Sequence, residues 1–403
     1  MRTPRIGFLT YDLQPFTEDC LYRVSEGLPN AEVRAYPVIA HKAQSRSRVR
    51  YQASSAKGRF LGLRYSRATP EGLASNVNWR AAWSCVANSD ICVLFGLQGG
   101  TALLVAILAR LAGRILVSVN QTLPAKWESR RRWWVRGLKW WLLRQCRFHI
   151  YQTWTSREVL VRIYGVPEDK LFFAPFEAGA RLFLRAVSEL RRSRSEVRES
   201  LGVPIDTVVL LFVGNLHPFK GVLDLIQSIA RVTRTSSMGI RCLFVGPEEP
   251  TNPEGATIAY FIRMAEQCGC SPHVQFMGLQ SLDRLVELYS AADIVVLPTH
   301  RDMFPKVLVE GALLGKPLLT STACGAIGSL VLEGENGLVV EPGDIEALSR
   351  AILRLLDPDL RDAMGRRSKE IVSQLCNSAA ETRGFVDALS RAVGELHLRR
   401  RTL

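Results

Sequence analysis

Short apolar runs alternate with segments of helical periodicity along almost the whole chain. In the first half, strongly apolar runs such as RIGFLT, DICVLFG and RILVSVN each precede a segment with helix-like spacing of apolar residues. The same alternation restarts with VVLLFVG and continues through RCLFVG, HVQFMG, DIVVLP and KPLLTS. Short continuous apolar runs between helices are typical of strands that are buried on both faces of a parallel sheet. The pattern therefore predicts an α/β fold with doubly wound sheets.

The alternation is interrupted once, by a charged and strongly helical segment over residues 184–206 that has no strand character. At 403 residues the chain is also too long for one ordinary core. We therefore expect a Rossmann-like N-terminal domain over residues 1–183, a linker over 184–206 and a Rossmann-like C-terminal domain over 207–378. Residues 379–403 are expected to form a final helix with a basic end. The basic, irregular stretch 41–67 is expected to form loops and one weak strand.

Composition narrows the class of protein. The hydrophobic fraction of 47% and the charged fraction of 22% are normal for a globular protein. Nine scattered cysteines without a Cys-x-x-Cys pair predict no metal site and no disulfide framework, as in a reducing cytosol. We expect a cytoplasmic protein, because no apolar run approaches the roughly 18 residues needed to span a bilayer. The net charge of +14 fits nucleic acid, an anionic membrane surface or phosphorylated small molecules.

Three stretches of the second half carry candidate chemistry. In LLFVGNLHPFKG, a strand ends at Gly214 and Lys220 opens a helix, an arrangement that suits a phosphate group. In PTHRDMFPKVLVEG, Asp302 lies in a loop and Glu310 in the second turn of the following helix, where carboxylates can accept hydrogen bonds from sugar hydroxyls. The third stretch, STACGAIG, contains glycines around Gly325 that let the backbone approach a ligand. Taken singly, each has an ordinary explanation as a turn, a helix cap or a surface charge.

Taken in order and with this spacing, the three stretches resemble the donor-binding domain of glycosyltransferase family 4. The resemblance runs from about residue 208 to residue 356, whereas the first half is similar only in its order of elements and in GVPEDKLFFAPF. It implies a retaining glycosyltransferase of GT-B fold, with two Rossmann-like domains that face across a cleft and a C-terminal helix that returns to the N-terminal domain. It also implies a nucleoside-diphosphate sugar as donor, with no cofactor and no bound metal.

The same resemblance implies roles for single residues. Lys220 would neutralise the diphosphate, Asp302 would contact the transferring sugar and Glu310 would bind the ribose, so these three form the expected catalytic set. Asn120, which follows the strand RILVSV, would lie on the acceptor side. The remaining donor-binding positions are Gly214, Asn215, Met277, Gly278, Met303, Phe304, Pro305, Gly325 and Ala326.

Three positions depart from the family pattern. Asn215 stands where the family usually has an arginine, Asp302 replaces a glutamate, and Asn120 stands where many members have a histidine. The loop YDLQPFTED also lacks the usual glycine pair. These departures support an alternative, in which the chain is a catalytically inactive GT-B protein that binds a sugar nucleotide as a partner of a glycan-synthesising complex. A basic nucleic-acid-binding module is a third interpretation, but no recognition motif accompanies the charge, so we expect no nucleic-acid partner.

The stretch KWESRRRWWVRGLKWWLLRQCRF combines tryptophans with cations. At helical spacing its tryptophans fall on one arc, and Arg132, Arg136 and Lys139 fall on the opposite one. Two interpretations remain open: an interfacial helix that docks on anionic lipid, or a helix that packs its tryptophans on the N-terminal sheet. In the first, the protein is a peripheral enzyme of the inner membrane face that extends a polysaccharide or lipid-linked glycan of the cell envelope. The expected membrane-surface residues are then Trp133, Trp134, Arg136, Lys139, Trp140 and Trp141.

Overall fold

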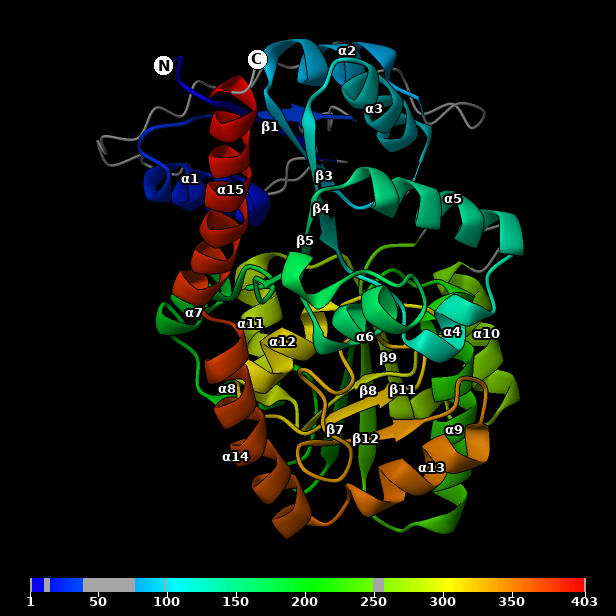
Figure 1. The fold of residues 1–403 in the computed structure, drawn as a ribbon. Helices are drawn as coiled ribbons and strands as arrows, with labels where there is room; N and C mark the ends of the chain where they lie inside the picture. Colours follow the sequence, from blue (N-terminus) through cyan, green and yellow to red (C-terminus); the bar gives the residue numbers. More distant parts are fainter. Residues whose placement is uncertain (1, 11–14, 39–76, 98, 249–256, 402–403) are drawn as a thin grey trace. The chain divides into compact units, whose positions relative to one another are not determined.

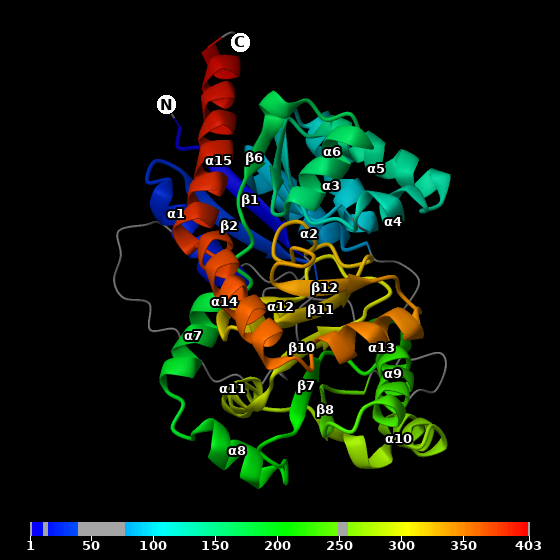
Figure 2. The same ribbon diagram turned by 90° about the horizontal axis from the view of Figure 1, so that it is seen from below.

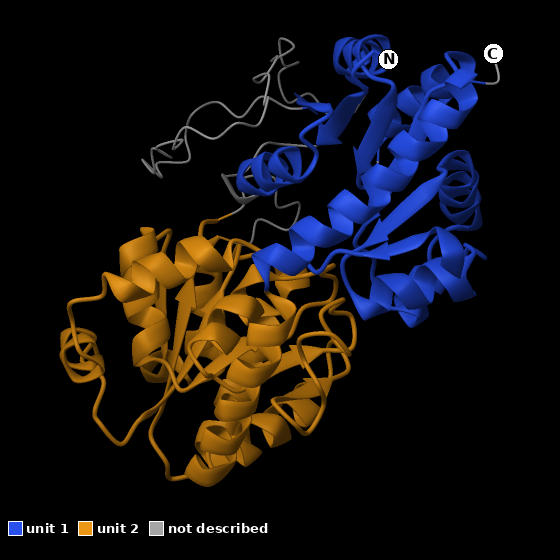
Figure 3. Cartoon of the chain, turned by 60° about the vertical axis from the view of Figure 1, so that its left-hand side comes forward, with its two compact units in different colours: residues 1–177, 377–403 blue, residues 178–376 orange. Residues whose placement is uncertain are grey.

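The computed structural model describes residues 2–10, 15–38, 77–97, 99–248 and 257–401. The chain forms two compact units, one of residues 1–177 with 377–403 and one of residues 178–376 (Figure 3). Each unit is built on a six-stranded sheet whose paired strands run parallel. The loops and weak strand expected within residues 41–67 lie outside the described residues.

The first unit has the strand order β2-β1-β3-β4-β5-β6. The order places β1 between β2 and β3, so the direction of winding reverses there, as in other doubly wound sheets. Its elements are β1 (Arg5–Thr10), α1 (Pro15–Gly27), β2 (Glu32–Pro37), α2 (Trp79–Asn88), β3 (Ile91–Phe95), α3 (Gly100–Leu111), β4 (Ile115–Asn120), α4 (Ala125–Ser129), α5 (Trp133–Gln145), β5 (Phe148–Tyr151), α6 (Trp154–Arg162), the 3-10 turn η1 (Glu168–Lys170), β6 (Leu171–Phe173) and α15 (Ser378–Arg401).

Both faces of this sheet are buried, which explains the unbroken apolar runs of its strands. Successive strand residues point to opposite faces, so Phe8 of β1 contributes to one hydrophobic cluster and Leu9 to the other. Helices α1 and α15 cover the first face, and α2, α3, α5 and α6 cover the second (Figure 1).

The C-terminal helix α15 returns to the first unit, as the sequence predicts. Phe385 is fully buried and stacks on Phe95 at a ring distance of 5.7 Å. Arg23 of α1 donates to the buried carboxylate of Glu381 at 2.8 Å and to the Ser378 carbonyl at 2.6 Å. Gly384 permits this close packing, because a Cβ there would lie 2.0 Å from the Phe173 carbonyl oxygen. The helix is therefore a buried layer of the unit, held by both apolar contact and ion pairing.

The second unit has the strand order β12-β11-β10-β7-β8-β9. Strands β12, β11, β10, β7 and β8 are labelled in Figure 2. Two Rossmann-like parallel sheets thus confirm the fold class that the sequence predicts. The elements of this unit are α7 (Ala180–Ser188), α8 (Arg194–Ser200), β7 (Val208–Val213), the 3-10 turn η2 (Pro218–Lys220), α9 (Val222–Thr235), β8 (Ile240–Val245), α10 (Ile258–Gln267), the 3-10 turn η3 (Ser271–His273), β9 (Val274–Gly278), α11 (Leu282–Ala291), β10 (Ile294–Leu297), α12 (Lys306–Leu313), β11 (Leu318–Ser321), β12 (Gly337–Val340), α13 (Ile345–Arg354) and α14 (Pro358–Leu375).

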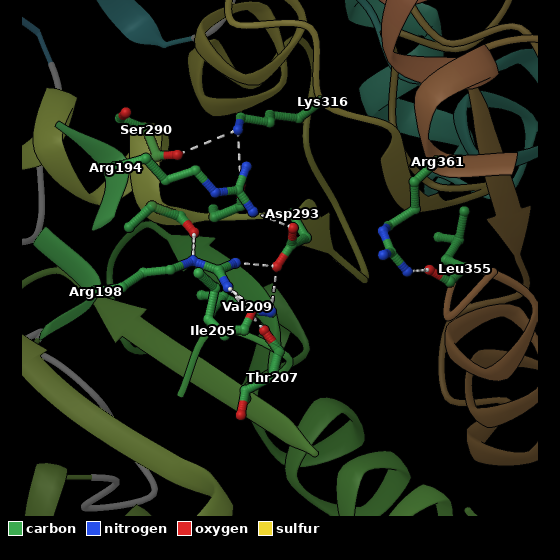
Figure 4. A network of polar contacts seen from close by, with 12 residues as sticks. Arg194, Arg198, Ile205, Thr207, Val209, Ser290, Asp293, Lys316, Leu355 and Arg361 are labelled. Carbon is green, nitrogen blue, oxygen red and sulfur yellow. Dashed lines mark hydrogen bonds and ion pairs between the residues drawn. The ribbon is translucent and has the colours of Figure 1, made fainter. Parts of the chain in front are cut away.

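The segment 184–206, expected to be a linker, is part of this second unit. Arg198 of α8 is nearly buried, forms an ion pair with Asp293 and donates to the carbonyls of Ala291 and Thr207 (Figure 4). Asp293 in turn accepts a hydrogen bond from the backbone N–H of Val209 at 2.7 Å. A buried arginine needs such partners, and here they all belong to the second unit. The charged segment that was expected to be a linker therefore contains a buried residue, Arg198, which anchors α8 to the second unit.

Candidate donor-binding site

The predicted donor residues lie on loops at the carboxyl ends of the parallel strands in the second unit. Lys220 follows β7 and Asp302 follows β10. These two strands are neighbours in the sheet, with Leu210 of β7 paired to Ile294 of β10, 84 positions later in the sequence. The order of strands reverses between β7 and β10. In open α/β sheets, ligands bind at the carboxyl ends of the strands beside such a switch point.

The loop after β7 ends in a tight turn that depends on a glycine. Gly221 joins η2 to α9 with a φ of 79°, a left-handed conformation that side chains disfavour. A Cβ at Gly221 would lie 2.1 Å from the Pro298 carbonyl oxygen. The start of α9 therefore approaches the end of β10 as closely as backbone allows. Asn215, at the beginning of this loop, is exposed.

Backbone and side-chain hydrogen bonds join the loops after β7 and β10. The His300 N–H donates to the Phe219 carbonyl at 2.7 Å, and the Thr299 hydroxyl donates to the same oxygen at 3.2 Å. The Lys220 ammonium then donates to Asp302 Oδ2 at 2.6 Å. Both side chains of this pair are largely shielded, with exposed fractions of 21% and 14%. Two residues that were predicted separately thus form one ion pair.

The third predicted stretch joins the same cluster. The Asp302 N–H donates to the Ala323 carbonyl at 3.3 Å, and the Gly325 N–H donates to the Asp302 carbonyl at 2.8 Å. Gly325 and Ala326 are buried in the loop that follows β11. The structure therefore brings all three stretches to one edge of the sheet.

Residues Met277 and Gly278 end the neighbouring strand β9. The Gly246 N–H donates to the Gly278 carbonyl at 2.9 Å, and a Cβ at Gly246 would lie 1.9 Å from the Gly214 carbonyl oxygen. The turns after β7, β8 and β9 are therefore in direct backbone contact.

Glu310 lies in α12, which begins directly after the buried pair Phe304 and Pro305. Its Oε2 accepts a hydrogen bond from the Tyr289 hydroxyl at 2.6 Å. Burial raises the pKa of Glu310, while the Tyr289 hydrogen bond and the charge of Lys306 act in the opposite direction. Met303, between Asp302 and Phe304, is half-buried.

Two residues near these loops were missed by sequence reasoning. His300 Nε2 lies 2.6 Å from Asp224 Oδ2 in the first turn of α9, and this hydrogen bond raises the pKa of His300. Tyr289 is fully buried and holds Glu310. The sequence does offer a signal for His300, because it stands two residues before Asp302. Tyr289 carries no such signal, because it falls on the apolar stripe of α11.

Asn120 ends β4 in the first unit, and its side chain turns into the protein. Its amide Nδ2 donates to Ser118 Oγ at 2.8 Å and to the Ile150 carbonyl at 3.2 Å. Ser118 Oγ also lies 2.8 Å from Nδ1 of the buried His149. These contacts place Asn120, Ser118 and His149 in one buried polar cluster. The acceptor-side role of Asn120 stays a prediction.

The tryptophan-rich stretch is two helices rather than one. The chain breaks at Arg130–Arg132, so α4 and α5 have separate axes, and Phe148 belongs to β5. Trp133, Trp134 and Trp140 are 83%, 51% and 42% exposed. Trp141, in contrast, packs partly buried against the core. The three exposed tryptophans fit docking on a lipid surface, whereas Trp141 fits packing on the N-terminal sheet.

The placement of Lys139 on an exposed cationic arc is wrong. Lys139 is buried and donates to Glu128 Oε1 at 2.7 Å, and the Tyr164 hydroxyl donates to the same oxygen at 2.7 Å. Burial lowers the pKa of Lys139, and the Glu128 carboxylate opposes that shift. The helical wheel misplaced it because a buried carboxylate 11 positions earlier outweighs the cost of removing the ammonium from water. Arg136 is half-buried and donates to the Ser129 carbonyl at 3.3 Å.

Among the described residues, no helix is long and apolar enough to cross a bilayer. The same part of the chain contains no group of three His, Cys, Asp or Glu side chains arranged to hold a metal ion.

Comparisons with known proteins agree with the fold. Residues 193–371 match the family model described as glycosyl transferases group 1, a segment that lies wholly within the second unit. The match covers most of the second unit, residues 178–376.

Two solved structures share the fold of the whole chain. The Anabaena protein Alr3699/HepE in complex with UDP and glucose has a TM-score of 0.68 at 18% identity, over 96% of this chain and 100% of that one. Sucrose-phosphate synthase from Thermosynechococcus elongatus has a TM-score of 0.66 at 18% identity, over 99% of each chain. At this level of identity the likeness confirms the GT-B fold alone.

Sequence relatives are similar over part of the chain. The D-inositol 3-phosphate glycosyltransferase of Acidothermus cellulolyticus is 32% identical over 222 residues, which are 54% of this chain and 47% of the relative. The chain spans about half the length of the curated relatives that it matches, 47%, 51% and 42% for three of them.

Proposed function

We propose that the chain is a retaining, metal-independent glycosyltransferase of family 4. In this proposal it transfers a sugar from a nucleoside-diphosphate sugar to a polysaccharide or lipid-linked glycan acceptor. The observation that carries the proposal is the convergence of Lys220, Asp302 and Gly325 at the carboxyl ends of neighbouring strands. Independent support comes from the glycosyltransferase group 1 match, which covers all three residues.

The chemistry follows from the groups at this edge. Transfer requires that negative charge on the departing diphosphate be stabilised as the glycosidic bond breaks. Lys220 supplies a cation at the opening of α9, and the backbone turns around Gly214 and Gly325 supply peptide dipoles. Asp302 is placed to accept from a hydroxyl of the transferring sugar, and Glu310 from the ribose. No cofactor is needed for such a step, because Lys220 provides the charge that stabilises the leaving group.

The first donors to test are uridine nucleotides. One structural neighbour was solved with UDP and glucose, and the sequence relatives carry the name D-inositol 3-phosphate glycosyltransferase. A UDP-sugar donor and an acceptor hydroxyl are therefore the substrates proposed for this chain. We propose a glycan or glycolipid as the acceptor, because the first unit exposes tryptophans beside arginines.

We propose that the first unit docks on the cytoplasmic face of a membrane. Helices α2, α3 and α5 cover the same face of the sheet and contain no Asp or Glu. Trp133 and Trp140 project from α5, and the Arg144 guanidinium lies 4.3 Å from the Trp140 ring centroid. Exposed tryptophans beside arginines suit the interface of an anionic bilayer.

A thermal-shift panel of nucleoside diphosphates and their sugars tests the function. Stabilisation by one base and its sugar conjugate is expected, because a ligand bound only to the native state raises stability by mass action. Hydrolysis of the stabilising donor without acceptor would show that the site is active.

Binding without any hydrolysis or transfer would instead support the inactive, partner-type interpretation. The replacement of the family arginine by Asn215 favours this second candidate, because it removes a cation from the edge where the diphosphate is proposed to bind. No stabilisation by any nucleotide would overturn both interpretations.

A further inference from the structure

The Tyr289 hydroxyl donates a short hydrogen bond to the Glu310 carboxylate. The distance is 2.6 Å, and Tyr289 is fully buried. Glu310 lies on α12 and Tyr289 on α11, so this contact joins two helices on one face of the second unit. We propose that Tyr289 is a positioning residue, which holds Glu310 in one rotamer and in its ionised form for nucleotide binding. This inference rests on the role proposed for Glu310.

Tyr289 is itself fixed by its surroundings. The ring of Phe183, on α7, meets the Tyr289 ring edge to face at 5.4 Å and 84°. Phe183 is also buried, so the tyrosine ring has a packed partner on the side of α7. An edge-to-face contact of this kind restrains both the position and the tilt of the ring. Its hydroxyl is thereby directed at α12.

The hydroxyl has two possible acceptors and one proton. Besides Glu310 Oε2, the Val307 carbonyl lies 3.3 Å away. With Glu310 ionised, the proton serves the carboxylate, which is both nearer and charged, and such charge-assisted bonds are the stronger ones. With Glu310 protonated, the carboxyl can donate to the tyrosine oxygen, and the tyrosine proton can turn to Val307. The pair therefore responds to the charge of Glu310.

This arrangement offsets the effect of burial. Burial raises the pKa of Glu310, and the Tyr289 hydrogen bond is the leading influence that lowers it again. A protonated carboxyl would lose one acceptor for the ribose hydroxyls, so nucleotide binding requires the ionised form. Oε2 is held by Tyr289, which leaves Oε1 as the oxygen that the ribose can use. The tyrosine thus sets both the charge and the orientation of the group.

The test uses Tyr289→Phe in the full chain, with UDP as the probe in isothermal titration. At pH 7 we expect UDP to bind about tenfold or more weakly, as for the loss of one hydrogen bond to a charged group. The pH below which UDP binding fails should move upward in Tyr289→Phe. In Glu310→Gln that dependence should disappear, and Tyr289→Phe should add little further loss. Tyr260→Phe, on α10 of the same unit, is the matched control and should leave binding unchanged.

A second measurement needs no ligand and separates this inference from the proposed function. The melting temperature of Tyr289→Phe relative to the parent should fall further as the pH rises through the pKa of Glu310, because the hydroxyl favours the ionised carboxylate. In the Glu310→Gln background the same substitution should cost an amount independent of pH. A pH-independent cost in both backgrounds would overturn the inference. If the melting data support the pair but no nucleotide binds the parent, the proposed function fails and the pairing stands.

Discussion

The ammonium of Lys220 lies 2.6 Å from the Asp302 carboxylate, so the cation assigned to the diphosphate is paired with the carboxylate assigned to the sugar. A diphosphate that enters this edge must compete with Asp302 for Lys220. The pair also keeps two largely shielded charges satisfied before any ligand binds. Asp302, being shorter than the usual glutamate of the family, reaches Lys220 from the neighbouring loop.

Removal of the competing carboxylate should therefore strengthen the binding of free UDP. We expect Asp302→Asn to bind UDP roughly fivefold more tightly, since a partly shielded ion pair is worth about 1 kcal/mol. The same variant should lose affinity for the UDP-sugar relative to UDP, because an amide accepts less strongly from the sugar hydroxyl. Isothermal titration with both ligands measures the two effects, and an equal loss for both would reject the assignment.

Lys220→Met should act in the opposite direction. Loss of a charged donor to the diphosphate should cost about 2–3 kcal/mol of binding free energy, for UDP and UDP-sugar alike. Because both side chains of the Lys220–Asp302 pair keep some exposure, 21% and 14%, the melting temperature should fall only slightly. Near-normal turnover of Lys220→Met with an identified donor would show that the phosphate group binds elsewhere.

The sequence predicted the elements of this site better than its contacts. Apolar runs mark where strands end, and most predicted donor residues lie at a strand end, in the loop after a strand or at a helix start in the second unit, with Glu310 one turn into α12. The Lys220–Asp302 pair spans 82 positions and depends on β7 and β10 being neighbours. Strand order is a global property of the sheet, which local periodicity does not report. Tyr289 was invisible for a related reason, since its hydroxyl finds a partner only after α11 and α12 pack.

The buried charges were the second failure of sequence reasoning. Helical periodicity placed Lys139 on the solvent side, and Arg198 falls within the segment that was expected to be a charged linker. Each is instead buried against a carboxylate, Glu128 and Asp293 respectively. Only the fold reveals such pairs, because the partners come from other elements.

Arg198 should be among the most sensitive positions for stability. Arg198→Ala removes one of the two arginines that pair with Asp293, the other being Arg194. It also removes the donor from three backbone carbonyls, those of Ala291, Ile205 and Thr207. We expect a loss of about 3–5 kcal/mol in the free energy of unfolding, as for one half of a buried ion pair. Arg350→Ala is the control, because its pair with Glu346 is 62% exposed on both sides and such pairs are worth under about 0.5 kcal/mol. Comparable losses in chemical denaturation would contradict the anchoring role of α8.

His149 should make the fold sensitive to mild acid. Burial lowers its pKa from 6.5 to about 4, with a smaller contribution from Lys170. Between these two values the unfolded chain binds the proton and the folded chain does not, so stability falls as the pH falls from 6.5 towards 4. The loss is on the order of 3 kcal/mol when complete. His149→Gln should start less stable at pH 7.5 but show a flatter dependence in this window, measured by urea unfolding.

Docking of the first unit on membranes is tested by sedimentation with vesicles. The parent should bind vesicles that contain phosphatidylglycerol, bind phosphatidylcholine vesicles weakly and be released by salt, because charges beyond a Debye length of about 8 Å are screened at physiological ionic strength. Arg132 and Arg144 are exposed on α5, whereas Lys139 is paired internally. The variant to use is therefore Arg132→Gln with Arg144→Gln.

Each cation near an anionic surface contributes about 1 kcal/mol, so this double variant should bind roughly tenfold or more weakly to anionic vesicles. Its melting temperature should match that of the parent, because neither side chain is buried. Trp133→Ser, which alters a side chain that is 83% exposed, should also weaken vesicle binding without loss of stability. Lys139→Met is the contrasting change: it leaves the buried Glu128 without its ammonium partner and should unfold at lower temperature. Vesicle binding that is unchanged in both the arginine and the tryptophan variants would exclude α5 from the contact, and the exposed tryptophans would then need another partner.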